Sequence, residues 1–428
     1  MKFLKQNVLL KVLSINSISI GISFVLGIFS LKIVSIFLGA PGMALMGSFR
    51  NFTTMLKSIA TLGINNSIIK LVADNKDDKA ALSSIYSTFF WLFISLSFLL
   101  GIATICLSKT ISKLLFYTTD FSLPIQFFGL ILPLIVINTF WLAIYNAVGN
   151  FKKILLIQII SNILIFVVAA FLVWKQNILG GIFSVALGEF LMFILTFAFI
   201  IREKDYFKFE LKKAINLKYL SSIKSFSLMA LLSAIIAPLT LVFIRNNIVQ
   251  YNSIHEAGIW DALNRLSSFY MVFFNSGLSL YYLPKLASLK TEFEFKKELV
   301  SYFKIIVPLF LVMSIVLFLF RNFIINLTFT ADFSDIKKIL IWQLLGDFLK
   351  IMTLAFGYQI VVKMMMKEYI IGEVFFNLSY FLLSFYLMKN NAISGVLEAY
   401  FYTSAALFLL ILFFFRKTFY AKSGLNKS

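Results

Sequence analysis

The feature that most constrains this chain is its repeated apolar runs of about 20 residues, the length at which an α-helix crosses a bilayer. Inside the bilayer core, only helices and closed barrels satisfy every backbone N–H and C=O group internally. Runs of this length exceed barrel strands, and only 14% of the residues are charged, against about a quarter in soluble proteins. The sequence therefore predicts an all-α polytopic membrane protein.

The apolar runs predict twelve transmembrane helices in two lobes of six. Residues 1–201 form the N-terminal lobe, 202–222 a cytoplasmic linker, and 223–428 the C-terminal lobe with a cytoplasmic tail. The linker is basic with interspersed Phe and Tyr, which is typical of a segment lying on an anionic membrane surface. The approximate spans are 12–38, 49–72, 83–107, 121–148, 151–174, 178–201, 223–246, 256–283, 299–320, 335–362, 369–388 and 393–416.

The distribution of basic residues predicts the orientation of the chain. With the N-terminus inside, 25 of the 39 Lys and Arg residues lie on the cytoplasmic side, 7 on the outer side and 7 within spans. Cytoplasmic loops carry such an excess in membrane proteins, so the net charge of +20 does not indicate nucleic-acid binding. Both termini are therefore expected on the cytoplasmic side.

The two halves resemble each other weakly. PGMALMGSFR leads into the second span and AGIWDALNR into the eighth, and a lysine follows each arginine at the same spacing: Lys70 after Arg50, and Lys285 after Arg265. The offset between the halves is therefore constant (265 minus 50, 285 minus 70). Both spans run from outside to inside, so the sequence predicts parallel repeats, which place substrates between the two halves in transporters.

Cations inside the predicted spans indicate the charge of the substrate. A cation in hydrocarbon costs roughly 2.5–3.5 kcal/mol on insertion scales and usually faces a cavity or a partner. Fewer acids share that depth, chiefly Asp261 and Asp347. The interior of the protein is therefore expected to be positive and its substrate anionic. The cations are Lys32, Arg50, Lys57, Arg245, Arg265, Lys304 and Lys350.

The second span carries a polar stripe. Spacings of three and four place its members on one face of a helix, and lipid cannot satisfy such a face. Hydrogen bonding between helices accounts for the threonines but poorly for two cations. The stripe is therefore interpreted as cavity lining. Its members are Arg50, Thr54, Lys57, Thr61 and Asn65.

Two acid–base spacings leave two interpretations open. Asp261 and Arg265 are four residues apart, and Asp347 and Lys350 are three apart. Either spacing allows a self-neutralised pair on one helix, and either cation could instead serve a ligand. Further protonatable groups in the spans are Glu189, Glu373 and Glu398.

Several motifs are absent from the sequence. There is no GxxxxGK[ST] loop, so no built-in ATPase is expected. The single cysteine, Cys106, and the single histidine, His255, offer no metal-spaced set, and no cofactor is expected. A proton or sodium gradient, or use of the product downstream, remains as the driving force.

Taken in order, several segments resemble the Wzx family of lipid-linked oligosaccharide flippases. They are Phe49-Arg50, Arg245, Gly258-Ile259-Trp260, Tyr282-Leu283-Pro284, the stretch WQLLGDFLK from Trp342 to Lys350, Gly357-Tyr358, Lys363 and Glu373. The family belongs to the superfamily that includes MATE drug exporters and the lipid II flippase. The similarity is greatest to the O-antigen and enterobacterial common antigen translocases.

The resemblance implies a MATE-like fold of two six-helix lobes around a central cavity. It implies a substrate of undecaprenyl pyrophosphate bearing a short sugar unit, membrane lipids as surroundings, and a polymerase and glycosyltransferases as pathway partners. Arg50, Arg245, Asp347, Lys350 and Glu373 match family positions. Lys57, Asp261, Arg265 and Glu189 do not match.

The sequence thus predicts a transporter without covalent chemistry, which moves the lipid-linked glycan to the periplasmic leaflet by alternating access. The alternatives are a MATE-type drug exporter, which needs an acidic cavity, and a membrane polymerase or ligase, which needs a sizeable outer loop. The predicted coupling or ion-pair residues are Asp261, Asp347 and Glu373. The residues predicted to bind the substrate in one central cavity are Arg50, Lys57, Arg245, Arg265 and Lys350.

Overall fold

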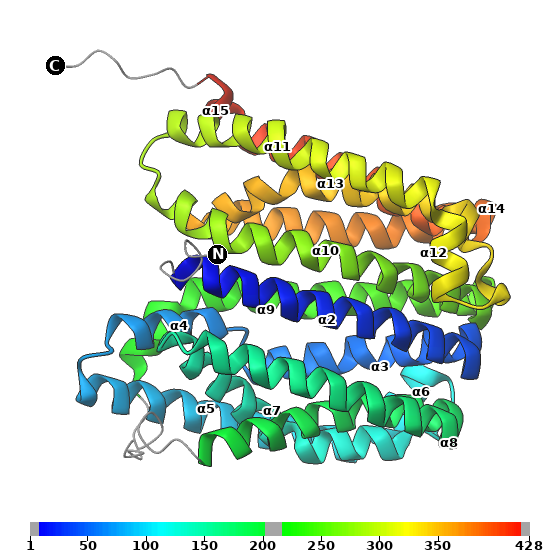
Figure 1. Cartoon of the computed structure of the whole chain (residues 1–428), viewed down its shortest axis with the longest axis horizontal. Coiled ribbons are helices and arrows are strands. Elements are labelled where there is room, and N and C mark those ends of the chain that lie inside the picture. Colours follow the sequence, from blue (N-terminus) through cyan, green and yellow to red (C-terminus); the bar gives the residue numbers. More distant parts are fainter. Residues whose placement is uncertain (1–7, 202–215, 421–428) are drawn as a thin grey trace. The chain divides into compact units, whose positions relative to one another are not determined.

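The computed structural model describes residues 8–201 and 216–420, and these residues are helical almost throughout (Figure 1). In chain order the longer helices are α2 (Val8–Phe37), α3 (Gly39–Ala60), α4 (Asn65–Asp74), α5 (Lys79–Cys106), α6 (Ser108–Phe116), α7 (Ser122–Ala147), α8 (Phe151–Ile201), α9 (Leu217–Tyr251), α10 (Ile254–Ser288), α11 (Glu292–Leu319), α12 (Arg321–Thr328), α13 (Ile336–Val362) and α14 (Met366–Phe414). A short 3-10 turn, η1 (Ala331–Phe333), precedes α13, and α15 (Arg416–Tyr420) follows α14.

The surfaces of these helices are those of a membrane protein. Eight of the described helices are long and apolar enough to cross a bilayer. Large apolar side chains in the middle of several helices stay exposed, for example Leu99 at 67%, Leu130 at 67% and Leu409 at 65%. A soluble protein rarely leaves apolar surface so contiguous, so lipid is the expected covering. The polytopic all-α prediction is confirmed.

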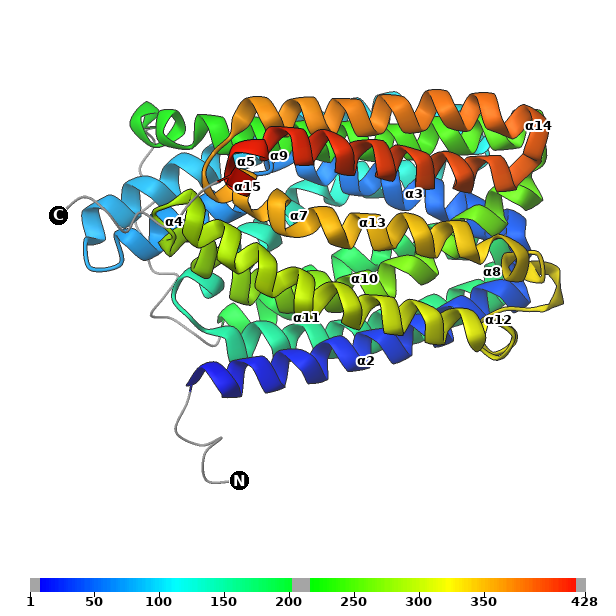
Figure 2. The same cartoon turned by 90° about the horizontal axis from the view of Figure 1, so that it is seen from above.

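Helices α8 and α14 each contain two of the predicted spans. They are 51 and 49 residues long, about twice what one crossing requires. Each contains one residue with non-helical backbone, Asn177 (φ 50, ψ −131) in α8 and Ala392 (φ 48, ψ −137) in α14. The chain reverses there, and Figure 2 shows the two halves of α14 side by side. The count of twelve spans stays a prediction.

The second predicted span, 49–72, was wrong in its bounds. The helix already begins at Gly39, because Pro41 lies in the first turn, where its missing N–H is tolerated. It ends at Ala60, and the backbone adopts positive φ at Leu62 (51) and Gly63 (62) before α4 begins. The polar stripe is therefore continuous only from Arg50 to Lys57, and Thr61 and Asn65 fall at the break.

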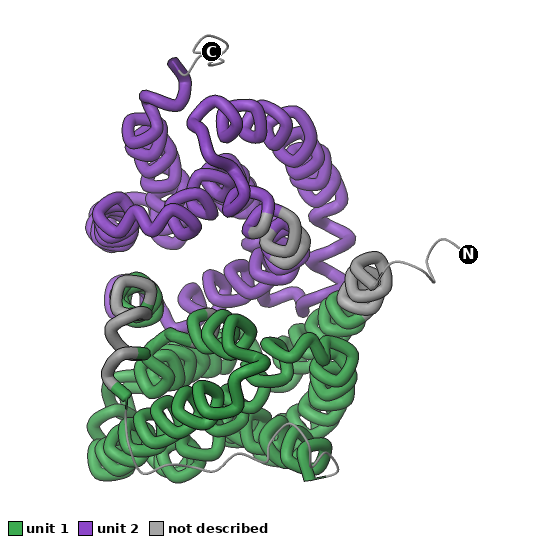
Figure 3. The backbone as a smooth tube through the Cα atoms, turned by 90° about the vertical axis from the view of Figure 1, so that its left-hand side faces the viewer, with its two compact units in different colours: residues 1–242 green, residues 243–428 purple. Residues whose placement is uncertain are grey.

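The described chain forms two compact units, residues 1–242 and 243–428 (Figure 3). The division lies within α9, whose start packs on the break after α3. The Ser227 hydroxyl donates to the carbonyl oxygen of Leu62 over 3.1 Å, and a Cβ on Gly63 would lie 2.8 Å from the Cβ of Ala230. Most of the predicted linker (202–215) and the end of the predicted tail (421–428) lie outside the described residues. The domain bounds drawn from the sequence stay a prediction.

The weak sequence repeat has a structural counterpart within the two units. Helices α3 and α10 begin at residues 39 and 254, and α8 and α14 at residues 151 and 366, so the offset is identical for both pairs (254 minus 39, 366 minus 151). The reversals at Asn177 and Ala392 show the same offset (392 minus 177). The two units therefore share an order of helices, and each has one residue with positive φ at the equivalent reversal.

Glycines allow the two reversals to close. A Cβ on Gly180 would lie 2.0 Å from the carbonyl oxygen of Leu172, and one on Gly395 would lie 2.4 Å from that of Leu387. A side chain could rotate away from the new Cβ, but these backbone carbonyl groups cannot move without distorting the helix. The two glycines are again separated by the offset of the repeat (395 minus 180), so the tight reversal belongs to the repeat.

We expect Gly395→Ala to destabilise unit 2 by more than the ~1–3 kcal/mol of ordinary overpacking, because the new methyl meets backbone. Gly357→Ala in α13 is the matched control, since a Cβ there meets nothing within 4 Å and alanine favours helix. The check is the thermal midpoint of each purified variant in detergent. Equal midpoints for the two variants would contradict the packing argument.

Candidate functional site

An open ion pair lies between two helices of unit 1. The Lys57 ammonium on α3 donates to both carboxylate oxygens of Glu189 on α8, over 3.0 and 2.9 Å. The two side chains remain 33% and 28% exposed. Arg50 precedes Lys57 by about two helical turns on the same face and is half-buried. The polar stripe of α3 thus carries Lys57, which is neutralised by Glu189, and Arg50 about two turns further along the helix.

A sealed ion pair lies in unit 2. The guanidinium of Arg245 on α9 donates two hydrogen bonds of 2.5 Å to the carboxylate of Asp261 on α10. The side chains are 2% and 11% exposed, and the guanidinium lies 5.5 Å from the ring centre of Trp260. Asp261 therefore takes its bidentate partner from the preceding helix, and not Arg265, the partner that the i,i+4 spacing suggested. Arg245 holds α9 to α10.

Asp347 on α13 is the centre of a buried hydrogen-bond network and is 1% exposed. Its carboxylate accepts from the hydroxyls of Ser267 (2.6 Å) and Tyr270 (2.5 Å) on α10 and from that of Tyr400 (2.7 Å) on α14. The Gln343 amide adds longer bonds of 3.2 and 3.3 Å. The hydrogen-bond partners of Asp347 are thus hydroxyls and an amide rather than a cation.

Lys350 is held by aromatic rings instead of by an acid. Its ammonium lies 5.0 Å from the ring centre of Phe376 and 4.8 Å from that of Tyr400, distances at which cation–π attraction acts. The direct ion pair with Asp347 that their spacing predicted does not form, because Tyr400 serves both residues: its ring faces the lysine, and its hydroxyl donates to the aspartate. Within residues 8–201 and 216–420, the three N–H donors of Lys350 have no hydrogen-bond acceptor.

The arginines Arg50 and Arg265 occupy equivalent positions of the repeat. Each is the eleventh residue after the first residue of its helix, Gly39 in α3 and Ile254 in α10. Arg265 is exposed, and its guanidinium lies 5.2 Å from the ring centre of Phe269. In the described part of the chain its N–H groups, like those of Lys350, have no hydrogen-bond acceptor.

Glu373, the remaining predicted coupling residue, lies on the first half of α14. Its side-chain carboxylate accepts from the amide of Asn377 over 3.3 Å, and its backbone carbonyl accepts from the same amide over 2.9 Å. No group of three or more His, Cys, Asp or Glu residues that could hold a metal occurs among the residues searched, those that the structure describes.

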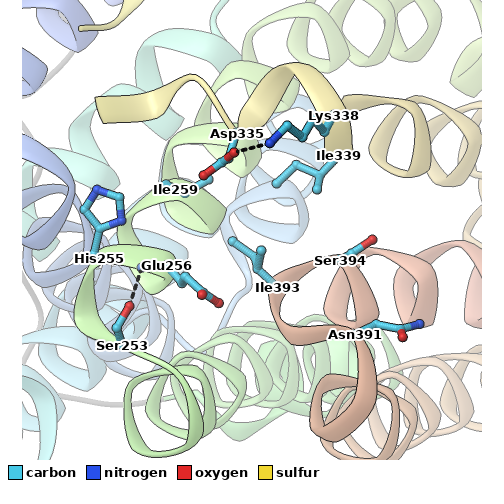
Figure 4. A pocket seen from close by; sticks show the side chains of 10 residues that line it. All are labelled: Ser253, His255, Glu256, Ile259, Asp335, Lys338, Ile339, Asn391, Ile393 and Ser394. Atoms are coloured by element: carbon cyan, nitrogen blue, oxygen red, sulfur yellow. Dashed lines mark hydrogen bonds and ion pairs between the residues drawn. The ribbon is translucent and has the colours of Figure 1, made fainter. Parts of the chain in front are cut away.

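A polar pocket of ≈ 290 Å³ lies in unit 2, where α10, α13 and the second half of α14 begin (Figure 4). It contains none of the predicted site residues, and an exposed ion pair of 3.0 Å joins Asp335 and Lys338 at its edge. His255 precedes the predicted eighth span (256–283), whereas α10 already begins at Ile254. The pocket is lined by Ser253, His255, Glu256, Ile259, Asp335, Lys338, Ile339, Asn391, Ile393 and Ser394.

The model of the polysaccharide biosynthesis protein family matches residues 9–290 of the chain. The chain belongs to this family. The lipid III flippase of Escherichia coli (strain K12) is 26% identical over 401 residues, which cover 92% of this chain and 94% of that protein. The sequence-based resemblance to the lipid-linked oligosaccharide flippases is thereby confirmed.

Solved structures show the fold of this family member. The lipid II flippase MurJ in an inward closed conformation has a TM-score of 0.74 at 19% identity, covering 94% of this chain and 88% of that one. An inward-facing multidrug resistance MATE transporter of the MOP superfamily has a TM-score of 0.73 at 13% identity, covering 94% and 96%. The MATE-like fold is confirmed.

The predicted cations of this family member are divided between its two units. Arg50 and Lys57 belong to unit 1, and Arg245, Arg265 and Lys350 belong to unit 2. Within unit 2, the N–H groups of Arg265 and Lys350 have no acceptor on the described chain, whereas Arg245 is paired with Asp261 through Nε and Nη2, and its buried Nη1 has no acceptor there. The meeting of the cations in one central cavity stays a prediction.

The sealed pair gives a stability prediction. Arg245→Met should destabilise unit 2 by roughly 3–5 kcal/mol, because it leaves the Asp261 carboxylate buried without its cation. Adding Asp261→Asn should recover much of that loss. Lys338→Ala is the control, because the pair with Asp335 is 81% and 55% exposed and should contribute at most about 1 kcal/mol. Thermal midpoints in detergent measure all three, and a double variant no better than Arg245→Met would refute the pairing.

Proposed function

We propose that this protein is a flippase for a lipid-linked oligosaccharide whose lipid and sugar are joined by an anionic diphosphate. Cations of the spanning helices bind the diphosphate while the lipid tail stays in the bilayer. Access to the bound headgroup then alternates between the two sides of the membrane, so that the sugar leaves at the outer leaflet.

The observation that carries this proposal is an imbalance in hydrogen bonding: the carboxylates accept hydrogen bonds from the chain, whereas two of the cations contact aromatic rings instead. Glu189 accepts from Lys57, Asp261 from Arg245, and Asp347 from three hydroxyls and an amide. By contrast, Arg265 and Lys350 have N–H donors without acceptors on the described chain. A ligand that binds these groups must supply acceptors, and an anionic acceptor forms the stronger, charge-assisted hydrogen bonds with a cation.

Diphosphate suits the chemistry of these groups. A guanidinium offers a planar fork that binds phosphate through two hydrogen bonds, and the repeat carries such a fork at Arg50 and again at Arg265. A diphosphate presents two charged groups, and each of them can accept from a fork of this kind. Lys350 adds a compact charge whose place is fixed by two rings.

A MATE-type cation exporter is the competing function, since the fold is common to both. Cationic drugs need carboxylates with acceptor capacity, and those described above already have donors from the chain. The charge of the spanning helices therefore favours the flippase.

The finer assignment follows from the family resemblance. We propose undecaprenyl pyrophosphate as the carrier, and O-antigen or a related surface glycan as its cargo. The lipid III flippase relative supports a lipid-linked cargo of this class. The expected location is the bacterial inner membrane with both termini in the cytoplasm, beside the polymerase and glycosyltransferases of the same pathway.

The test is transport by the purified protein in liposomes that contain a fluorescent polyprenyl diphosphate bearing one sugar. Protection of the fluorophore from a membrane-impermeant reducing agent reports movement between leaflets. We expect faster exchange than in protein-free liposomes, and no competition by a cationic dye. Competition by the dye, with no movement of the lipid, would favour the drug exporter.

Arg50→Ala should abolish this transport, while Arg50→Lys keeps part of it because the charge remains and the fork is lost. Lys304→Ala is the matched control, since Lys304 is an exposed cation on α11, close to the start of the predicted span 299–320, where its long side chain can reach the interface. Initial rates at equal amounts of inserted protein provide the measurement. Full transport by the alanine variant would remove Arg50 from the site.

Lys350→Met should also abolish transport, and Phe376→Leu should weaken substrate binding by about two- to thirty-fold, as expected for the loss of one cation–π contact of ~0.5–2 kcal/mol. Phe385→Leu is the control on the same helix, because its ring lies under Lys389 instead, 4.4 Å from that ammonium. Dissociation constants for the labelled lipid provide the readout. Equal effects of the two phenylalanine variants would point to a general packing defect.

A further inference from the structure

Two ion pairs in the described spanning helices differ in access. Arg245 and Asp261 are 2% and 11% exposed, whereas Lys57 and Glu189 are 33% and 28% exposed. Both oxygens of Glu189 accept from one ammonium, so the open pair is complete but can still be reached. A pair of this kind can exchange one partner, because a competing ion can approach before the first has left.

Glu189 has no substitute on the long helices of unit 1. Helices α2, α3, α5, α7 and α8 contain no other carboxylate. The helices packed against α8 are α2, α3 and α7. Any anion that binds Lys57 therefore competes with this one carboxylate. The other titratable groups on those helices and on α8 are Lys11, Lys32, Arg50, Tyr145, Lys152, Lys153 and Lys175.

The pair is also peculiar to unit 1. The equivalent positions in unit 2, displaced by the offset that relates the two arginines (265 minus 50, 272 minus 57, 404 minus 189), are Val272 and Ser404, which carry no charge. Arg50 is repeated as Arg265, but the lysine and its acid are not. The open pair is thus a feature of one unit rather than of the scaffold common to both.

We propose that Glu189 is an internal competitor of the substrate: the anionic diphosphate replaces it on Lys57, and the displaced carboxylate takes up a proton. This inference rests on the proposed function. A carboxylate left without its cation in a low-dielectric region favours the neutral form. Binding of the anion and binding of a proton therefore become coupled, and each strengthens the other.

The competition also gives specificity. When no substrate is bound, Glu189 neutralises the Lys57 ammonium within the span. To displace Glu189, a ligand must interact with Lys57 more favourably than a single carboxylate does. A diphosphate diester, with two charged groups, meets that condition better than a lipid with one phosphate. Removing the competitor should therefore both tighten binding and relax this selection.

The test is binding by the full-length protein in nanodiscs at pH 6, 7 and 8. The probe is a polyprenyl diphosphate bearing one N-acetylglucosamine, a diester that does not titrate in this range. For the wild type we expect tighter binding as the pH falls, by at most about tenfold per unit for one linked proton. Glu189→Gln should bind tightly at all three pH values and should accept the single-phosphate lipid better than the wild type does.

Lys57→Met should bind weakly and without pH dependence, and Lys57→Arg should keep the pH dependence. The double variant Lys57→Met with Glu189→Gln covers the case in which Glu189→Gln folds poorly, because it leaves no unpaired charge. It should bind as Lys57→Met does, since the acid acts only through the lysine. A gain from Glu189→Gln that persists without Lys57 would overturn the competitor role.

The outcomes separate the two proposals. If the wild type does not bind the probe at any pH, the proposed function fails. If the wild type binds, but Glu189→Gln leaves both the affinity and the pH dependence unchanged, only the competitor role fails. Thermal midpoints recorded on the same samples identify a variant that is merely unfolded.

Discussion

The organising constraint in this protein is that a charge in an apolar helix must be satisfied by the protein itself. The chain meets it in four ways: a sealed pair at Arg245 and Asp261, a carboxylate surrounded by hydroxyls at Asp347, a lysine between rings at Lys350, and an open pair at Lys57. The carboxylates have more hydrogen-bond partners within the protein than the cations have. That asymmetry favours anions as ligands, and the packing of α10, α13 and α14 around Asp347 follows from the same requirement.

The internal repeat relates the helices of the two units but few of their charged side chains. The starts of α3 and α10, the starts of α8 and α14, and the two chain reversals recur at one offset (366 minus 151, 392 minus 177), and so does one arginine on equivalent helices. The specialised groups do not recur. In unit 1 the positions equivalent to Asp347 and Lys350 are taken by Leu132 and Ile135. A similar order of helices thus carries a different arrangement of charges in each half.

Much of the fold could be predicted from the sequence, because apolar length and basic loops report directly on a bilayer. The partners of the charges could not. Spacing proposed Asp261 with Arg265 and Asp347 with Lys350, whereas Arg245 comes from the preceding helix and Tyr400 from a later one. The break after Ala60 was missed for a similar reason: it is stabilised by contacts from α9, far along the chain. Cation–π neighbours such as Phe376 leave no local signal in a sequence with 51 phenylalanines.

The reversals at Asn177 and Ala392 limit how the protein can move. Two spanning segments joined through a single non-helical residue, with a glycine pressed on the facing backbone, have no slack between them. One segment cannot slide past the other by a helical turn of about 5.4 Å without breaking that joint. The two halves of α8, and likewise the two halves of α14, are therefore expected to move as one rigid body. A change of access would then come from tilting these helix pairs, not from sliding of one half along the other.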